Sequence, residues 1–130
     1  MTRILIDSSA WIHFFNQSSR WHYESVAKTI REDQGVTCGL IITEVLRGAR
    51  NNKEQTILSD HFELLEYLPL TKEDHLTAAA KGFQLARKGV TVKTIDLLIA
   101  HLAIENKLTL LHDDSDFEMI AKYFDLRTLV

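Results

Sequence analysis

Short apolar runs alternate along the chain with longer segments in which apolar residues recur every three to four positions. The short runs predict buried β-strands, and the longer segments predict amphipathic helices. Strands are expected at residues 3–6, 36–40, 66–70, 108–111 and 126–130. Helices are expected at residues 10–15, 21–33, 52–63, 94–106 and 117–123, in a stretch that starts at Thr43, and between Thr71 and Gly89.

The order of these elements determines the predicted fold class. All-apolar strands that alternate with amphipathic helices indicate an α/β fold, with a central parallel sheet of about four to five short strands flanked by helices on both faces. Because we find no repeat, linker or low-complexity tract, residues 1–130 are expected to form a single domain. In such sheets, ligands bind beyond the carboxyl ends of the strands.

Local patterns add predictions about packing. Thr71 followed by Asp74 is close to a capping box. The face that this helix buries is expected to contain Leu76, Ala79, Ala80 and Phe83. Thr94 is expected to cap the next helix, whose inward face should contain Ile95, Leu98, Ile99, Leu102 and Ala103. Core packing is the leading interpretation of Trp11 and Ile12.

Composition limits the compartment and the kind of partner. An apolar content of 45% is ordinary for a globular domain, and the single cysteine, Cys38, cannot form an internal disulfide. The first apolar run ends at Asp7, so no signal peptide is visible. The stretch from Leu97 to Ile104 is too short to span a membrane. We therefore expect a soluble, cytoplasmic protein without a membrane partner.

Five acidic residues are expected at or near one edge of the sheet: Asp7, Glu44, Asp96, Asp114 and Asp116. Converging carboxylates repel one another, so they must spread out, take up protons or bind cations. Oxygen-only ligands suit Mg²⁺ or Mn²⁺, and such an ion can activate a water and stabilise charge on a phosphate. Each acid taken singly has a plainer interpretation as a helix-terminal, solvent-exposed or turn residue. Their joint placement favours phosphodiester hydrolysis.

The net charge of −3 argues at first sight against a nucleic-acid partner. That argument weakens if the five acids hold metal, because the 15 basic residues then outnumber the remaining acids. Bound cations would cancel much of the acidic charge that is left. Nucleic acid therefore stays among the possible substrates.

Four blocks of the sequence resemble the signature blocks of a known family. In chain order they read ILIDSSAWI, LIITEVLRGA, TIDLLIAHLA and LTLLHDDSDFEMIA. Together they resemble those of PIN-domain nucleases, and most closely those of the VapC-type toxins of toxin–antitoxin pairs. The resemblance spans nearly the whole chain. It implies a PIN-like domain, endonucleolytic RNA cleavage, dependence on Mg²⁺ or Mn²⁺, homodimerisation, and neutralisation by a small cognate antitoxin protein.

The resemblance also implies roles for individual residues. The catalytic acidic quartet would be Asp7, Glu44, Asp96 and Asp114, and the metal ligands would be Asp7, Asp96, Asp114 and Asp116. Ser8 would support the first aspartate. His112 occupies a position where threonine or serine is frequent in the family. Asp113 beside Asp114 leaves the register of the last ligand ambiguous, and the spacing to Phe117 favours Asp114.

Three basic residues are candidates for RNA binding at the rim of the acidic site: Arg47, Arg50 and Lys93. An Arg–Glu helix pair or a solvated loop residue explains them equally well. An exposed part of the stripe of Trp11, Ile12 and Phe15 could form a groove for an antitoxin helix. The histidines lack the paired spacing of a zinc site, and none is assigned a catalytic role.

Three other functions compete with the metal-dependent ribonuclease. A binding module with a degraded site would sequester RNA or protein without turnover, but the chain retains all four acids of the quartet. A phosphotransfer domain would use Asp7 as its acceptor, yet it would leave Glu44 and the pair of Asp114 and Asp116 unexplained. A DNA-directed nuclease is the nearest enzymatic alternative, because carboxylate-held metal treats both kinds of phosphodiester alike.

Overall fold

The fold is built on a sheet of short parallel strands. The computed structural model describes residues 2–130, and within them the strands are β1 (Ile4–Ile6), β2 (Gly35–Thr37), β3 (Glu66–Tyr67), β4 (Thr109–Leu111) and β5 (Arg127–Leu129). All neighbouring strands are parallel, in the order β3-β2-β1-β4-β5. The predicted parallel sheet is confirmed. Its central strands, β1 and β4, place their carboxyl ends side by side.

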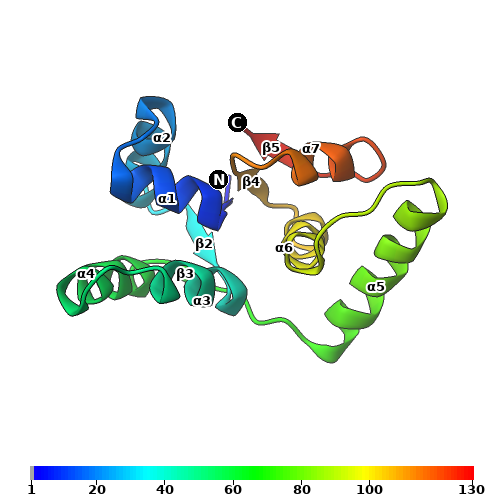
Figure 1. Cartoon of the computed structure of the whole chain (residues 1–130), viewed down its shortest axis with the longest axis horizontal. Coiled ribbons are helices and arrows are strands. Elements are labelled where there is room, and N and C mark those ends of the chain that lie inside the picture. Colours follow the sequence, from blue (N-terminus) through cyan, green and yellow to red (C-terminus); the bar gives the residue numbers. More distant parts are fainter. Residues whose placement is uncertain (1) are drawn as a thin grey trace.

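The helices form two groups. Within residues 2–130 they are α1 (Ser8–Asn16), α2 (Arg20–Arg31), α3 (Gly39–Arg47), α4 (Asn52–Glu63), α5 (Lys72–Arg87), α6 (Thr94–Glu105) and α7 (Ser115–Ala121). Helices α1 to α4 pack on one another, and α6 packs on α5 and α7 (Figure 1). Because the chain crosses from β1 to β3 in one direction and returns to β5 in the other, right-handed crossovers place the two groups on opposite faces. The predicted α/β class is therefore confirmed.

The core lies between the central strands and the helices that cover them. Leu5, Ile6, Leu110 and Leu111 are fully buried in β1 and β4, and Trp11 packs beside Phe62 with ring centroids 5.0 Å apart. The buried face predicted for α6 is largely correct, because Leu98, Ile99, Leu102 and Ala103 are buried and Ile95 is partly buried. None of the helices described between residues 2 and 130 has the length and apolarity needed to cross a membrane.

Several predicted boundaries are wrong by a few residues. Residues 36–40 were expected to form one strand, but β2 ends at Thr37 and α3 begins at Gly39, four residues before the predicted start. A short apolar run is compatible with a buried strand or a buried helix, so periodicity could not separate them. Lys93 rather than Thr94 is the N-cap residue of α6, and α7 begins at Ser115, two residues before the predicted start at residue 117.

The predicted buried face of α5 is wrong. Thr71 and Asp74 do form the capping box, but Leu76 and Phe83 are 56% and 64% exposed, and Ala79 and Ala80 are exposed as well. The helix instead buries Ala78 and Leu85. A Cβ atom at Gly82 would lie 2.7 Å from Leu97 Cδ2, so the small residues allow α6 to approach this side. When a helix has apolar residues on several sides, tertiary packing determines which side is buried.

Ile12 also differs from its predicted core position. Trp11 is fully buried, as expected, but Ile12 is 53% exposed. Ile12 and Phe15 line a groove of about 360 Å³ with Val45 and Leu58. The apolar stripe of α1 is therefore divided between the core and an open groove between α1, α3 and α4.

Candidate active site

Asp7 lies at the point where β1 ends and α1 begins. Its backbone N–H donates to the carbonyl of Leu111 at 2.9 Å, which ties the carboxyl ends of β1 and β4 together. Asp7 Oδ2 caps α1 by accepting from the Ser9 backbone N–H at 3.0 Å and from Ser9 Oγ–H at 2.6 Å. The other carboxylate oxygen, Oδ1, is buried and has no hydrogen-bond partner within residues 2–130. Capping thus uses one oxygen and leaves the second available to a ligand.

Three further carboxylates meet beside this edge of the sheet. Ligand atoms of Asp96, Asp114 and Asp116 all lie within 4.8 Å of one another, and we call these three residues the acidic cluster. The Lys93 backbone N–H donates to Asp116 Oδ2 at 3.2 Å. The Asp116 backbone N–H donates to Asp114 Oδ1 at 2.9 Å. Asp96 Oδ2 is buried and lacks a partner within residues 2–130. Among residues 2–130 the cluster therefore has a buried acceptor without a hydrogen-bond donor.

The electrostatics of the site favour a bound cation. Burial, and then the negative charges of Asp114, Asp7 and Asp116, raise the pKa of Asp96 to about 7. Burial also raises the pKa of Asp7, although the hydrogen bonds from Ser9 oppose the effect. A divalent cation would offset the repulsion and satisfy the partnerless oxygens. The donors are all oxygen, which suits Mg²⁺ or Mn²⁺, so the residues present fit such an ion.

Glu44 lies at the rim and does not belong to the acidic cluster. It is exposed on α3, and its Oε1 accepts from Ser8 Oγ at 3.2 Å. Its pKa is raised by partial burial and by Asp7, against the lowering effects of Ser8, Arg47 and Lys93. Those effects place both basic side chains within electrostatic reach of Glu44. Arg50, by contrast, forms an ion pair with Glu54 at 2.9 Å.

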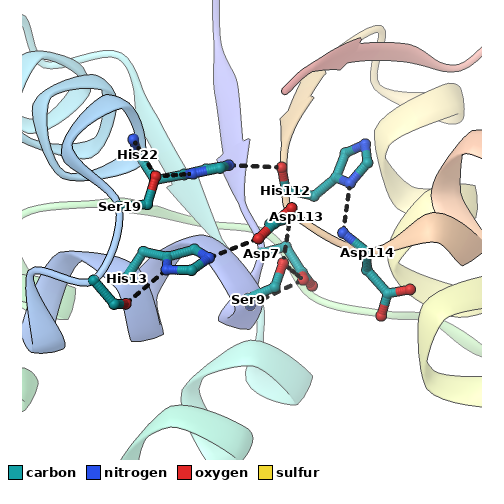
Figure 2. A network of polar contacts seen from close by, with 9 residues as sticks. Asp7, Ser9, His13, Ser19, His22, His112, Asp113 and Asp114 are labelled. Carbon is teal, nitrogen blue, oxygen red and sulfur yellow. Dashed lines mark hydrogen bonds and ion pairs between the residues drawn. The ribbon is translucent and has the colours of Figure 1, made fainter.

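The neighbouring residues Asp113 and Asp114 point in different directions (Figure 2). Asp114 joins the acidic cluster, whereas Asp113 Oδ2 lies 2.6 Å from His13 Nε2. Asp114, and not Asp113, is therefore the residue that lies with Asp96 and Asp116. His112 is buried, accepts from the Asp114 backbone N–H at 3.1 Å through Nδ1, and contacts Glu118 through Nε2.

Two features of this region were missed in the sequence. Ser9 bridges the site, because its hydroxyl donates to Asp7 and accepts from the Asp113 backbone N–H at 2.9 Å. His13 and His22 approach each other across the α1–α2 turn, with ring centroids 4.7 Å apart. Ser9, in the Ser8–Ser9 pair that follows Asp7, was a visible signal for the first feature. His13 also contacts Asp113, which lies 100 positions away in the chain, and no local pattern reports that contact.

The fold and the site together define a parallel α/β protein with a cluster of carboxylates at the carboxyl edge of its sheet. The chain belongs to the PIN-domain family, which it matches over residues 4–123. It is 34% identical over 128 residues to the VapC ribonuclease Mb1587 of Mycobacterium bovis, with 95% of this chain and 96% of the relative covered. The same identity and coverage hold for the ribonuclease VapC11 of Mycobacterium tuberculosis. The predicted family resemblance is confirmed.

Solved structures show the same fold. The DNA-bound VapBC of Salmonella typhimurium aligns with a TM-score of 0.78 at 18% identity, covering 99% of this chain and 98% of that one. At that level of identity the likeness concerns the fold alone. It agrees with the parallel sheet and the two helix groups described above.

Proposed function

We propose that this protein is a Mg²⁺- or Mn²⁺-dependent endoribonuclease and the toxin of a toxin–antitoxin pair. The observation that carries the proposal is the acidic cluster, in which Asp96 keeps a buried, partnerless oxygen beside Asp114, Asp116 and Asp7. Relatives of 34% identity that span the whole length are named ribonucleases. We further propose that residues 1–130 act as one domain and that the protein works in the cytoplasm.

The proposed mechanism assigns the four aspartates to cation binding. Asp7, Asp96, Asp114 and Asp116 would hold the ion, and Ser8 and Ser9 would keep Glu44 and Asp7 in place. When bound, the cation activates a water and neutralises charge that develops on the phosphate. Glu44 lies at the rim with a raised pKa, so its free carboxylate oxygen is suited to orient the attacking water and take its proton.

The rim of the acidic cluster supports binding of a polyanion. Arg47 and Lys93 act electrostatically on Glu44, which supports a role for both in contacting a phosphate of the RNA. Arg50 was an equal candidate, but its guanidinium is held by Glu54 Oε2 through two hydrogen bonds at 3.0 and 2.9 Å. We therefore assign RNA binding to Arg47 and Lys93 first, and to Arg50 only after its ion pair opens.

Two surfaces support the proposed protein partners. The groove between α1, α3 and α4 combines apolar side chains, among them Ile12, Phe15 and Leu58, with polar ones that include Glu44 and Arg50. A groove with both kinds of lining fits an amphipathic helix, here that of an antitoxin. The exposed apolar face of α5, with Leu76 and Phe83 at its ends, supports a homodimer. A toxin–antitoxin complex from Klebsiella pneumoniae is among the solved structures with the same fold.

The function is tested by incubating cellular RNA, and separately DNA, with the purified, antitoxin-free protein. We expect discrete RNA products with Mg²⁺ or Mn²⁺ and none with EDTA. Asp96→Asn should abolish the products, whereas Asp60→Asn, the same change at an exposed position of α4, should not. Equal cleavage by parent and Asp96→Asn would refute the site. Cleavage of DNA alone would favour a DNA-directed nuclease, and stoichiometric binding without turnover would favour a binding module.

A further inference from the structure

A second cluster of possible ligands lies on the other side of the loop that carries Asp114. His13 of α1, His22 of α2 and Asp113 of the β4–α7 loop each offer a ligand atom, and these atoms lie within 4.8 Å of one another. His13 Nε2 is 2.6 Å from Asp113 Oδ2, and the two imidazole rings stack at 24° between their planes. We call these three residues the histidine cluster (Figure 2).

Both imidazoles are held by a hydroxyl group at the nitrogen that faces away from the cluster. Ser18 Oγ lies 2.7 Å from His13 Nδ1, and Ser19 Oγ lies 2.7 Å from His22 Nδ1. His22 Nε2 faces the backbone carbonyl of His112 at 3.2 Å. Histidines that bind metals are usually fixed in this manner, because a partner on one ring nitrogen sets the tautomer and aims the other nitrogen at the ion.

We propose that His13, His22 and Asp113 form a zinc site that is separate from the acidic cluster. Two imidazole nitrogens and one carboxylate oxygen are donors that zinc prefers, whereas Mg²⁺ prefers oxygen alone. His22 is buried, His13 has 22% of its side chain exposed and Asp113 has 55%. An ion would enter from the side of Asp113, and a water would complete its coordination.

The short His13–Asp113 contact is compatible with this proposal. Ligands about 2.0–2.2 Å from a tetrahedral zinc stand further apart than 2.6 Å, so one of them must turn aside as the ion enters. Asp113 can do so because its side chain is more than half exposed. His13 is held by Ser18 and need not move, whereas His22 Nε2 must exchange its contact with the His112 carbonyl for the ion, with the ring proton on Nδ1 facing Ser19 Oγ. The structure therefore presents His13 in place, a second imidazole beside it and a carboxylate free to adjust.

A zinc ion in the histidine cluster would fasten the loop at residues 112–114 to α1 and α2. The Asp113 backbone N–H donates to Ser9 Oγ, and Ser9 Oγ–H in turn donates to Asp7. The same loop continues into Asp114. Zinc would therefore act as a structural clamp behind the acidic cluster and raise the thermal stability of the protein without taking part in the chemistry.

The test uses tag-free, metal-stripped protein titrated with Zn²⁺ in excess Mg²⁺, which occupies oxygen-only sites. Calorimetry should give one Zn²⁺ per chain, and thermal unfolding should shift upward. His13→Gln and Asp113→Asn should each weaken zinc binding at least about 100-fold, since loss of a supporting residue alone costs about 10–100-fold. His75→Gln, a histidine change at an exposed position of α5, is the matched control and should bind like the parent.

A second variant separates ligand loss from misfolding. Ser18→Ala keeps all three ligands but removes the partner of His13 Nδ1, so it should weaken zinc binding about 10–100-fold while circular dichroism stays unchanged. Zinc binding that survives in His13→Gln, or that is lost in Asp96→Asn instead, would overturn the proposal. Failure to bind one equivalent of Zn²⁺ would overturn it too. None of these measurements uses RNA, so the ribonuclease proposal stands or falls separately.

Discussion

The loop between β4 and α7 separates two clusters that use neighbouring aspartates for different chemistry. Asp114 faces Asp96 and Asp116, where all donors are oxygen and one carboxylate has a pKa of about 7. Asp113 faces His13, where a nitrogen base already pairs with the acid. The first cluster consists of carboxylates alone, whereas the second pairs its carboxylate with two imidazoles. Adjacent residues of the same type therefore acquire different roles from the direction in which each side chain leaves the loop.

The largest expected difference between the clusters concerns RNA cleavage. We predict that Asp114→Asn lowers the Mg²⁺-dependent rate at least about 100-fold, because it removes a ligand and not merely a supporting residue. Asp113→Asn should lower it less than about tenfold, since Asp113 is turned away from the acidic cluster. Single-turnover cleavage of one RNA by both variants provides the comparison. Equal losses would show that the two aspartates serve one site.

A second difference concerns the dependence of stability on pH. Because the folded-state pKa of Asp96 is raised, the folded protein holds a proton that the unfolded chain has already released between about pH 4 and pH 7. The free energy of unfolding should therefore fall as pH rises through that window. Asp96→Asn cannot ionise, so at pH 8 in EDTA it should be more stable than the parent by about 2–4 kcal/mol.

Urea titrations at pH 4 and pH 8 measure this effect. At pH 4 the two proteins should differ little, since the parent carboxyl is protonated when folded. Asp60→Asn serves as the control, because Asp60 is exposed on α4 and lies outside both clusters. A parent and an Asp96→Asn variant with the same pH slope would contradict the proposed repulsion within the acidic cluster.

A smaller effect is expected at the residue that links the clusters. Ser9→Ala removes the hydroxyl that donates to Asp7 and accepts from the Asp113 backbone, so it should cost about 1–2 kcal/mol of stability. Ser8→Ala loses only the bond of 3.2 Å to exposed Glu44 and should cost less. Denaturant unfolding of both variants gives the difference. A larger loss of stability in Ser8→Ala than in Ser9→Ala would show that Ser9 does not bridge the two clusters.

The smallest effects are expected at the rim. Arg47→Ala should raise the KM for RNA roughly fivefold, as expected for one phosphate contact of about 1 kcal/mol. Arg50→Ala should change KM less, because Arg50 is paired with Glu54, and should cost a few tenths of a kcal/mol in stability. Measuring KM at two salt concentrations checks the assignment, since a lost phosphate contact also lowers the salt dependence. A larger rise in KM for Arg50→Ala than for Arg47→Ala would assign the phosphate contact to Arg50 instead.

The sequence predicted the parts of the molecule that depend on local pattern. The apolar run from Ile4 to Ile6 predicted a buried strand, and Asp7 directly after it predicted a carboxylate at the edge of the sheet. Asp7 also caps the helix that follows. The fold class and the family followed from the same blocks. Asp114 was preferred over Asp113 from spacing alone, and the two side chains do diverge.

Features that depend on long-range packing were not predictable in this way. Leu40 belongs to an apolar run that suits either a strand or a helix, and only the packing of α3 decides between them. Leu76 and Phe83 have helical spacing, yet α6 packs on the side with Ala78 and Gly82. The histidine cluster needs the α1–α2 turn and the β4–α7 loop to meet. The spacing of residues along the chain does not predict that contact.

The most direct test of the acidic cluster as a cation site is Mg²⁺ binding measured by calorimetry at pH values from 6 to 8. Since the pKa of Asp96 is about 7, binding at pH 6 must displace a proton. We predict that the affinity rises up to about tenfold per pH unit below pH 7 and levels off above it, and that Asp96→Asn binds weakly at every pH. An affinity that is independent of pH, or equal in Asp96→Asn, would contradict the account.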